Sequence, residues 1–231
     1  MTGYQEIYTD PSYFGQIVVN TTSHIGNYGV NADEQESATP KISGVVVNEF
    51  SKLFSRKTAD SSLNDYFIKH NTVGISGLDS RSLVRHIRSK GAMNAIISSE
   101  IFDKAELMAK LKQVPSMDKL ELSSKVTTKE AYTYGDENNK MKVAVLDLGI
   151  KQSILKNMAA RGIYCKVFPA QTTFKEMEAW KPTGYFISNG PGDPSVMDYA
   201  VTTVKEILAA DKPLFGICLG HQILALACGI S

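Results

Sequence analysis

Cys218 ends an apolar run and stands between two glycines, in the segment FGICLGHQILAL of residues 215–226. Glycines two residues before and after a nucleophile are typical of a nucleophile elbow, where a strand turns sharply into a helix and strains the reactive residue. The helix that follows would direct free N–H groups and its positive dipole end at the sulfur, which favours the thiolate. We therefore predict that Cys218 is a catalytic nucleophile that accepts an acyl group.

A thiolate that attacks a carbonyl group needs N–H donors for the oxygen anion that forms. The backbone N–H of Leu219, directly after the nucleophile, would supply one of them. We expect the second from the glycine-rich segment SNGPGDP, residues 188–194, because Gly190 and Gly192 let backbone amides approach a ligand closely.

The other two cysteines lack the flanking glycines that are typical of a nucleophile elbow. Cys165 lies inside a strand pattern without a neighbouring glycine, and Cys228 falls in the last turn of an alanine-rich helix, so both are expected in the core. The pair Cys218 and His221 could hold a metal ion, but a site needs three or four ligands and the sequence offers no companion pair. We therefore expect no metal.

A cysteine nucleophile also needs a base, and the sequence offers four histidines: His24, His70, His86 and His221. His221 follows the nucleophile on the same helix and is expected to pack against neighbouring strands, whereas His86 lies mid-helix on a solvated or interface face. His70 ends a helix, where its charge suits the dipole, and His24 lies in a loop without an evident acidic partner. None of the four is a convincing base.

The elements around the nucleophile follow a regular order. Strands and helices alternate from residue 141 onward, which predicts right-handed βαβ units and a parallel sheet covered on both faces. Cys218 and SNGPGDP then lie at the carboxyl ends of strands, where ligands bind in such sheets. The expected strands are 142–149, 163–170, 184–190 and 213–218, and the expected helices are 151–162, 173–180, 199–211 and 220–229.

The chain before residue 135 has a different character. Strands are expected at 16–20 and 42–50 around a Gly- and Asn-rich loop, followed by helices at 61–71 and 79–91. The turn-rich segment 131–140 reads as a linker, so we predict two domains, 1–135 and 141–231. The basic stripe of the second helix is expected to be a solvated face, with a subunit contact as the alternative; it consists of Arg81, Arg85 and Arg88.

Composition excludes several classes of protein. The 231 residues are 43% apolar and 21% charged, and 25 basic side chains face 24 acidic ones, which gives no electrostatic case for nucleic acid or a membrane surface. The sequence shows no membrane span and no signal peptide. Three cysteines, an odd number, fit free thiols in a reducing compartment, so we expect a cytoplasmic protein.

Two groups of motifs resemble a known family. SNGPGDP and FGICLGHQ are similar to class I, or triad, glutamine amidotransferases; MTGYQEIYTDPSY, HIGNYGVN and GISGLDSRSLVRHIRSKGAMNAII resemble the small subunit of carbamoyl phosphate synthetase. The similarity runs essentially from end to end. It implies an α/β protein in which an N-terminal swivelling β/β/α-type domain precedes a parallel-sheet amidotransferase domain.

The resemblance also implies a reaction. Cys218 would attack the carboxamide of glutamine, release ammonia and leave a glutamyl thioester that water hydrolyses. Gln222, the backbone of Leu219 and the two loop glycines, Gly190 and Gly192, would hold glutamine. Ser12 of TDPSY would close over the substrate, although TDPSY by itself indicates only a turn with proline at its second position.

The ammonia would pass to a large synthetase subunit, the expected partner, which uses ATP, Mg and bicarbonate to make carbamoyl phosphate for arginine and pyrimidine synthesis. No cofactor is expected in this subunit. Two alternatives stay open: a noncatalytic module that docks on a synthetase, and another class I amidotransferase or cysteine hydrolase of similar fold.

The family pattern has a further strand-rich segment before MTGYQE, and strands with a base histidine and a glutamate after the nucleophile helix. We therefore expect a chain truncated at both ends, with an exposed apolar sheet edge, poor solubility and negligible glutamine hydrolysis on its own. Without this histidine and glutamate, general acid–base catalysis would be lost, which lowers the rate of such reactions by about 10² to 10⁴-fold. A turnover number near that of a complete small subunit would contradict this expectation.

Overall fold

The computed structural model describes residues 3–230, and the chain divides into two compact units, residues 1–116 and 117–231. This boundary is earlier than the linker expected from the sequence, since residues 117–135 belong to the second unit. Part of the expected linker forms β6 (Tyr132–Tyr134), which pairs with β8 (Ile163–Pro169) of the second unit. Strand β6 lies at the edge of the sheet and its first two residues are exposed. Its sequence can therefore be polar, and a polar sequence does not predict a strand.

The first unit is built on two small parallel sheets, one with the order β1-β3-β5 and one formed by β2 and β4. The strands are β1 (Ile17–Val19), β2 (His24–Ile25), β3 (Gly44–Val46), β4 (Glu49–Phe50) and β5 (Val73–Ile75). The α-helices are α1 (Tyr4–Thr9), α2 (Leu63–Lys69), α3 (Ser80–Lys90) and α4 (Lys104–Leu111); η1 (Pro11–Tyr13) and η2 (Ala32–Glu34) are 3-10 turns.

Helices α2 and α3 confirm the sequence prediction, whereas α1 and α4 were not expected. Leu63, Tyr66 and Phe67 of α2 are buried together in the core of this unit. Asp79 caps α3 by accepting a hydrogen bond from the Ser82 N–H at 2.9 Å. The arginines of α3 are exposed, as a solvated face requires: Arg81, Arg85 and Arg88.

The second unit contains a five-stranded sheet with the order β10-β9-β7-β8-β6. The four strands expected from the sequence are parallel, and only β6 is antiparallel. The remaining strands are β7 (Met141–Asp147), β9 (Gly184–Ile187) and β10 (Leu214–Gly216). The helices are α5 (Gln152–Ala159), α6 (Phe174–Glu178), α7 (Asp198–Ala209) and α8 (Leu219–Ala227), with 3-10 turns η3 (Ser123–Lys125) and η4 (Pro194–Val196).

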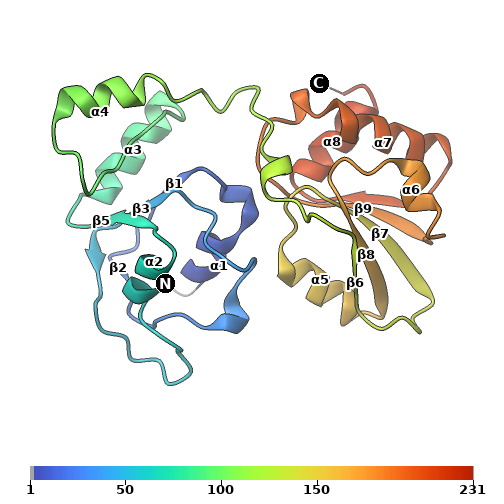
Figure 1. Ribbon diagram of the computed structural model, residues 1–231, viewed down its shortest axis with the longest axis horizontal. Helices are drawn as coiled ribbons and strands as arrows, with labels where there is room; N and C mark the ends of the chain where they lie inside the picture. Colours follow the sequence, from blue (N-terminus) through green and yellow to red (C-terminus); the bar gives the residue numbers. More distant parts are fainter. Residues whose placement is uncertain (1–2, 231) are drawn as a thin grey trace. The chain divides into compact units, whose positions relative to one another are not determined.

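The two faces of this sheet are covered unequally. Helices α6, α7 and α8 lie together on one face and α5 lies on the other (Figure 1). The first face carries the larger core, in which Leu146, Ile187 and Ile223 are completely buried. Within residues 3–230, every helix is too short or too polar to cross a membrane. The sequence prediction of a sheet covered on both faces therefore holds fully for one face only.

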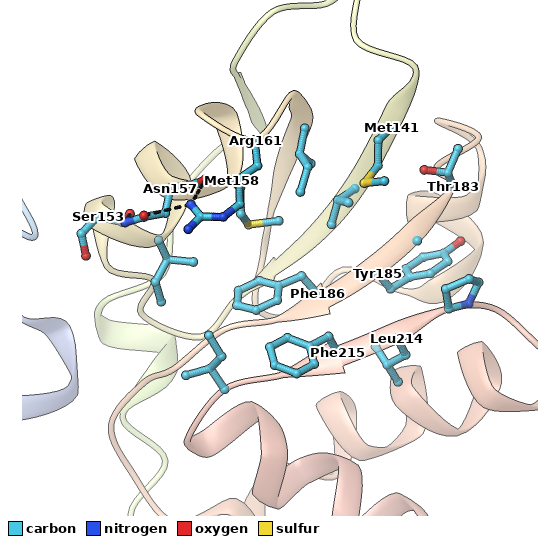
Figure 2. A pocket seen from close by; sticks show the side chains of 16 residues that line it. Met141, Ser153, Asn157, Met158, Arg161, Thr183, Tyr185, Phe186, Leu214 and Phe215 are labelled. Carbon is cyan, nitrogen blue, oxygen red and sulfur yellow. Dashed lines mark hydrogen bonds between the residues drawn. The ribbon is translucent and has the colours of Figure 1, made fainter.

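Beside α5, the second face of the sheet opens into an apolar hollow of about 790 Å³ (Figure 2). Phe186 and Phe215, from neighbouring strands, stack with ring centroids 6.2 Å apart, and residue Phe215 is 64% exposed. The hollow follows the edge strand β10, so the apolar sheet edge expected from the sequence is present.

We expect Phe215→Lys to reduce self-association of the isolated 231-residue polypeptide. An exposed apolar face beside an unpaired strand edge favours contact between copies, and a charge at its centre opposes that contact. Light scattering after size-exclusion chromatography measures the effect over a concentration series. The control is Leu208→Lys on α7, which removes an exposed apolar side chain (39%) outside the hollow. Equal association of the two variants would contradict the prediction.

Candidate active site

Cys218 links β10 to α8 in the conformation expected of a nucleophile elbow. Its φ of 52° and ψ of −113° lie in a region that residues other than glycine rarely adopt. The residue is exposed, whereas Leu219, the first residue of α8, is buried. The prediction that this cysteine occupies a strained strand-to-helix turn is confirmed.

The two glycines beside Cys218 permit close backbone contacts. A Cβ atom on Gly216 would lie 2.5 Å from the Gly220 carbonyl oxygen, and one on Gly220 would lie 2.2 Å from the Ile187 carbonyl oxygen. Real Cβ atoms do not approach backbone so closely, so a side chain at either position would push β9, β10 and α8 apart. The elbow therefore requires glycine at both positions, as its sequence pattern predicts.

The N-terminus of α8 leaves donors free near the sulfur. The Gln222 N–H donates to the Cys218 carbonyl oxygen at 3.1 Å, which begins the helix, while no described residue accepts a hydrogen bond from the Leu219 N–H. Gln222 is exposed one helical turn after Cys218, so the two residues share a side of α8. Cys218, Leu219 and Gln222 are thus brought together.

The loop SNGPGDP begins beside the elbow. A Cβ atom on Gly220 would lie 2.8 Å from the Ser188 carbonyl oxygen, and the Ile217 N–H donates to the Ile187 carbonyl oxygen at 3.2 Å. The two predicted oxyanion segments therefore meet at the carboxyl ends of β9 and β10.

The glycines of this loop have a role that the sequence did not indicate. A Cβ atom on Gly190 would lie 2.0 Å from the Leu148 carbonyl oxygen. One on Gly192, whose φ is 103°, would lie 2.8 Å from the Leu120 carbonyl oxygen. Both glycines are thus required by close approach to the protein's own backbone, and their contact with a ligand stays a prediction.

Asp147 joins the loops at this edge of the sheet. Its carboxylate accepts hydrogen bonds from the backbone N–H groups of Thr128 (2.7 Å), Gly149 (2.9 Å) and Ile150 (2.8 Å). The side chain of Ser188 accepts from the Leu148 N–H at 2.9 Å, which ties the ends of β7 and β9 together. Burial raises the pKa of Asp147, and the three backbone hydrogen bonds only partly offset this effect.

The raised pKa of Asp147 predicts a pH-dependent stability. A carboxyl group with a higher pKa in the folded than in the unfolded state favours folding most below the unfolded pKa, near 4, and loses that contribution as pH rises through the folded pKa. The stability of the wild type relative to Asp147→Asn should therefore fall as pH rises from about 4. Denaturant unfolding, followed by fluorescence of Trp180, the single tryptophan, measures this difference. A stability of the wild type, relative to Asp147→Asn, that grows with pH would show that the three backbone hydrogen bonds outweigh the effect of burial on the pKa of Asp147.

Ser12 lies in the first unit, within the 3-10 turn Pro11–Tyr13. Its N–H donates to Asp10 Oδ1 at 2.8 Å, and Pro11 holds the second position of the turn, which confirms the local prediction for TDPSY. Ser12 and Cys218 belong to different units, so the contact of Ser12 with a substrate stays a prediction.

The histidines differ in part from the sequence expectations. His221 is exposed rather than packed against strands, because its side of α8 faces solvent. The Nδ1 atom of His24 lies 3.0 Å from Glu49 Oε2, since the pairing of β2 with β4 supplies an acidic partner that the sequence did not reveal. His70 caps α2 and His86 is exposed, both as expected. Among residues 3–230, no histidine hydrogen-bonds to Cys218.

Cys165 is completely buried, as predicted, and burial raises the pKa of its thiol to about 11. Cys228 is exposed, so its assignment to the core was wrong: it caps the end of α8, beyond the last buried turn. In the described part of the chain, histidine, cysteine and acidic side chains form no group of three or more that could hold a metal ion.

Sequence reasoning missed a segment that contacts the loop, here called the brace (residues 119–124). The Asp193 N–H donates to the Leu120 carbonyl oxygen at 2.9 Å, and Ser123 Oγ donates to the Pro191 carbonyl oxygen at 3.1 Å. An isolated antiparallel bridge joins Glu121 to Gly192. Lys119 lies in a turn and Ser123 in the 3-10 turn η3, so this segment has no regular periodicity that the sequence could reveal.

Comparison with known proteins gives two family matches. Residues 1–97 match the model of the carbamoyl-phosphate synthase small chain, CPSase domain, and residues 144–231 match the class I glutamine amidotransferase model. The second match includes Cys218, the glycine loop and α8.

Individual proteins are similar over almost the whole chain. The carbamoyl phosphate synthase small chain of Synechocystis sp. is 44% identical over 244 residues, which cover 99% of this chain and 64% of that protein. The small chain of Chlorobaculum tepidum is 45% identical over 231 residues, covering 99% and 63%, and that of Yersinia pestis is 43% identical over 245 residues, covering 99% and 63%. The chain thus spans somewhat less than two thirds of the length of these curated relatives.

Proposed function

Because the chain belongs to the carbamoyl-phosphate synthase small chain family, we propose that it is the glutamine-hydrolysing subunit of a carbamoyl phosphate synthetase. The observation that carries this proposal is the exposed Cys218 in an elbow with a φ of 52°. A cysteine with only a packing role would have no reason to be exposed in a strained turn at a helix N-terminus.

In the proposed reaction, the Cys218 sulfur first forms a thioester with the substrate and is then released from it by water. The Cys218 thiolate attacks the carboxamide carbon of glutamine, and the N–H groups of Leu219 and of the 188–194 loop stabilise the oxygen anion. The carbon–nitrogen bond then breaks, and the nitrogen takes up a proton and leaves as ammonia. Water adds to the remaining thioester, which releases glutamate and restores the thiolate.

The residues around the sulfur would hold the substrate. We assign the glutamine contacts to Gln222, which shares a side of α8 with the nucleophile, and to the loop glycines Gly190 and Gly192. We also assign a contact with the glutamine substrate to Ser12 of the first unit.

The ammonia needs an acceptor, and we propose a large synthetase subunit that forms a heterodimer with this chain in the cytoplasm. That partner would bind ATP and Mg and make carbamoyl phosphate for arginine and pyrimidine biosynthesis. This subunit would need no cofactor of its own, because thiolate attack and thioester hydrolysis proceed without one.

A glutamine-like electrophile tests the proposal directly. We expect 6-diazo-5-oxo-L-norleucine to modify Cys218 once per chain and to leave Cys165 and Cys228 unmodified, with glutamine slowing the reaction. Peptide mass spectrometry locates the adduct. The exposed Cys228 is an internal control for general thiol reactivity. Absence of an adduct, or equal labelling of Cys228, would favour a noncatalytic docking module.

A further inference from the structure

Helix α3 carries an excess of basic side chains. Four of the 25 basic residues of the protein lie on this helix, which has no acidic residue: Arg81, Arg85, Arg88 and Lys90. The remaining 21 basic side chains are outnumbered by the 24 acidic ones, so the chain outside α3 has a net negative charge. The positive charge of α3 is therefore a local feature and not a property of the whole surface.

Two arginines of α3 have no acidic partner. Among residues 3–230, neither Arg85 nor Arg88 forms an ion pair. Arg81 differs, because Asp79, the cap of the helix, lies close enough to attract it. Arg85 and Arg88 are three positions apart and project from the same side of α3. A shallow concavity of about 520 Å³ is lined by both of them together with His86 and Ser89. Two such guanidinium groups can bind carboxylates of another molecule, each through a pair of parallel hydrogen bonds.

The body of α3 is also incompletely covered. The helix contacts β1, yet Ser80 is its only buried residue. Exposed apolar residues lie beyond both ends: Leu78, two residues before the helix, is 39% exposed, and Met93, three residues after it, is 49% exposed. The apolar residues of the helix itself are only partly buried: Leu83, Val84 and Ile87. Helix α3 thus presents apolar and positively charged surface together.

This mixture of side chains fits a protein partner better than a nucleic acid. Arginine and methionine are enriched where protein surfaces meet, and carboxylates on the facing surface complement the arginines. A nucleic acid is bound through many phosphate contacts along a broad positive surface. The chain outside α3 is net negative and would repel a phosphate backbone. The partner that fits α3 is therefore a protein with an acidic surface.

The position of α3 in the chain indicates which protein this is. Residues 1–97, which include α3, match the CPSase domain of the carbamoyl-phosphate synthase small chain, whereas residues 144–231 match the model of class I glutamine amidotransferases. Helix α3 thus lies in the part of the chain that distinguishes this family within the class. A surface that recognises a synthetase partner is expected in that part, because the amidotransferase model is shared by the whole class.

We propose that the basic face of α3, centred on Arg85 and Arg88, docks on an acidic surface of the large synthetase subunit. The inference rests on the proposed function and assigns its partner a surface on this chain. Carboxylates of that subunit would bind the two guanidinium groups, and the exposed apolar residues at both ends of the helix would be covered in the same contact. Opposite charges on the two surfaces would also steer their encounter and speed association.

The test is the double variant Arg85→Glu, Arg88→Glu, titrated against the large subunit at physiological salt. We expect its Kd to be at least about 10-fold higher than that of the wild type, because the carboxylates of the partner then meet like charges. Surface plasmon resonance measures both binding constants. The wild-type Kd should rise with salt concentration and that of the variant should not, since salt screens an attraction that only the wild type has.

A second variant, Arg85→Gln, Arg88→Gln, removes the charges without introducing repulsion. Glutamine is a good helix former, so this variant tests the surface even where the glutamates unfold α3. Its Kd should be at least about 3-fold higher than that of the wild type. Labelling of Cys218 by 6-diazo-5-oxo-L-norleucine should be unchanged in both variants, because α3 has no part in the proposed chemistry.

The matched control is Lys140→Glu, Lys205→Glu, which changes the net charge by the same amount as the first variant. Both lysines are exposed and belong to the second unit. The Kd of this control should stay within about twofold of the wild type, because salt screens charges that lie outside the contact. Circular dichroism should show the same helix content in the control, the glutamine variant and the wild type.

The results separate the docking surface from the proposed function. A wild-type chain that does not bind the large subunit would overturn the partner in the proposed function. A wild type that binds, with an unchanged Kd in the glutamine variant or an equal loss in the lysine control, would overturn only the docking surface. Binding of a short DNA duplex at the same salt, lost in the α3 variants, would identify a nucleic acid surface and also overturn the proposal.

Discussion

Replacing Cys218 with serine will, under the proposed function, reduce glutamine-dependent carbamoyl phosphate synthesis by the complex with the proposed large subunit by at least about 10³-fold. A serine hydroxyl is not ionised at neutral pH, and the described residues place no histidine in hydrogen-bond contact with this position to remove its proton. Serine is close to cysteine in size and can occupy the same elbow, so the loss reports chemistry rather than folding. The measurement is product formation with glutamine, followed by the same assay with added ammonia.

The ammonia-dependent rate of Cys218→Ser should equal that of the wild type, because the nucleophile has no part in the later steps. Cys228→Ser is the matched control, since Cys228 is an exposed cysteine at the other end of α8. It should keep full activity with both nitrogen sources. Retention of more than a tenth of the glutamine-dependent rate in Cys218→Ser would exclude Cys218 as the nucleophile.

Local patterns predicted the elbow well because its requirements are local. Two close backbone contacts demand Gly216 and Gly220, and the strained residue between them must carry the reactive group. The alternation of strands and helices likewise predicted β7 to β10 and α5 to α8, since burial in a parallel sheet leaves a repeating apolar pattern.

Features that depend on distant partners could not be predicted in this way. The brace contacts residues about 70 positions later in the chain, as in the bond from Ser123 to Pro191. The Glu49 partner of His24 exists only because two short strands pair. A side chain's solvent exposure near a helix end, as for Cys228, depends on which elements cover that end.

The 188–194 loop combines a feature that the local sequence predicts with one that depends on distant partners. Its composition correctly indicated an unusual backbone at the carboxyl end of β9, yet Gly190 and Gly192 pack against different segments, at Leu148 and Leu120. A contact with the protein's own backbone and a contact with a ligand both require glycine, so sequence alone cannot separate them. The structure shows the first requirement, which makes the stability of the loop testable without any substrate.

Gly190→Ala should destabilise the second unit by about 4 kcal/mol or more, or prevent its folding. The new Cβ atom would lie 2.0 Å from the Leu148 carbonyl oxygen and 2.7 Å from its carbon, both backbone atoms that a side-chain rotation cannot move. Relief requires separation of the ends of β7 and β9, where Leu148 also donates to Ser188. Denaturant unfolding followed by Trp180 fluorescence reports on this unit, because Trp180 packs against its core.

Gly184→Ala is the matched control in the same chain segment. A Cβ atom on Gly184, at the start of β9, would lie 3.5 Å from the Pro213 carbonyl oxygen, an ordinary contact distance, and its φ is not positive. We therefore expect a change of no more than about 1 kcal/mol in the free energy of unfolding. Equal stability of the two variants would mean that the 188–194 loop can move away from β7 without cost, which would contradict the prediction.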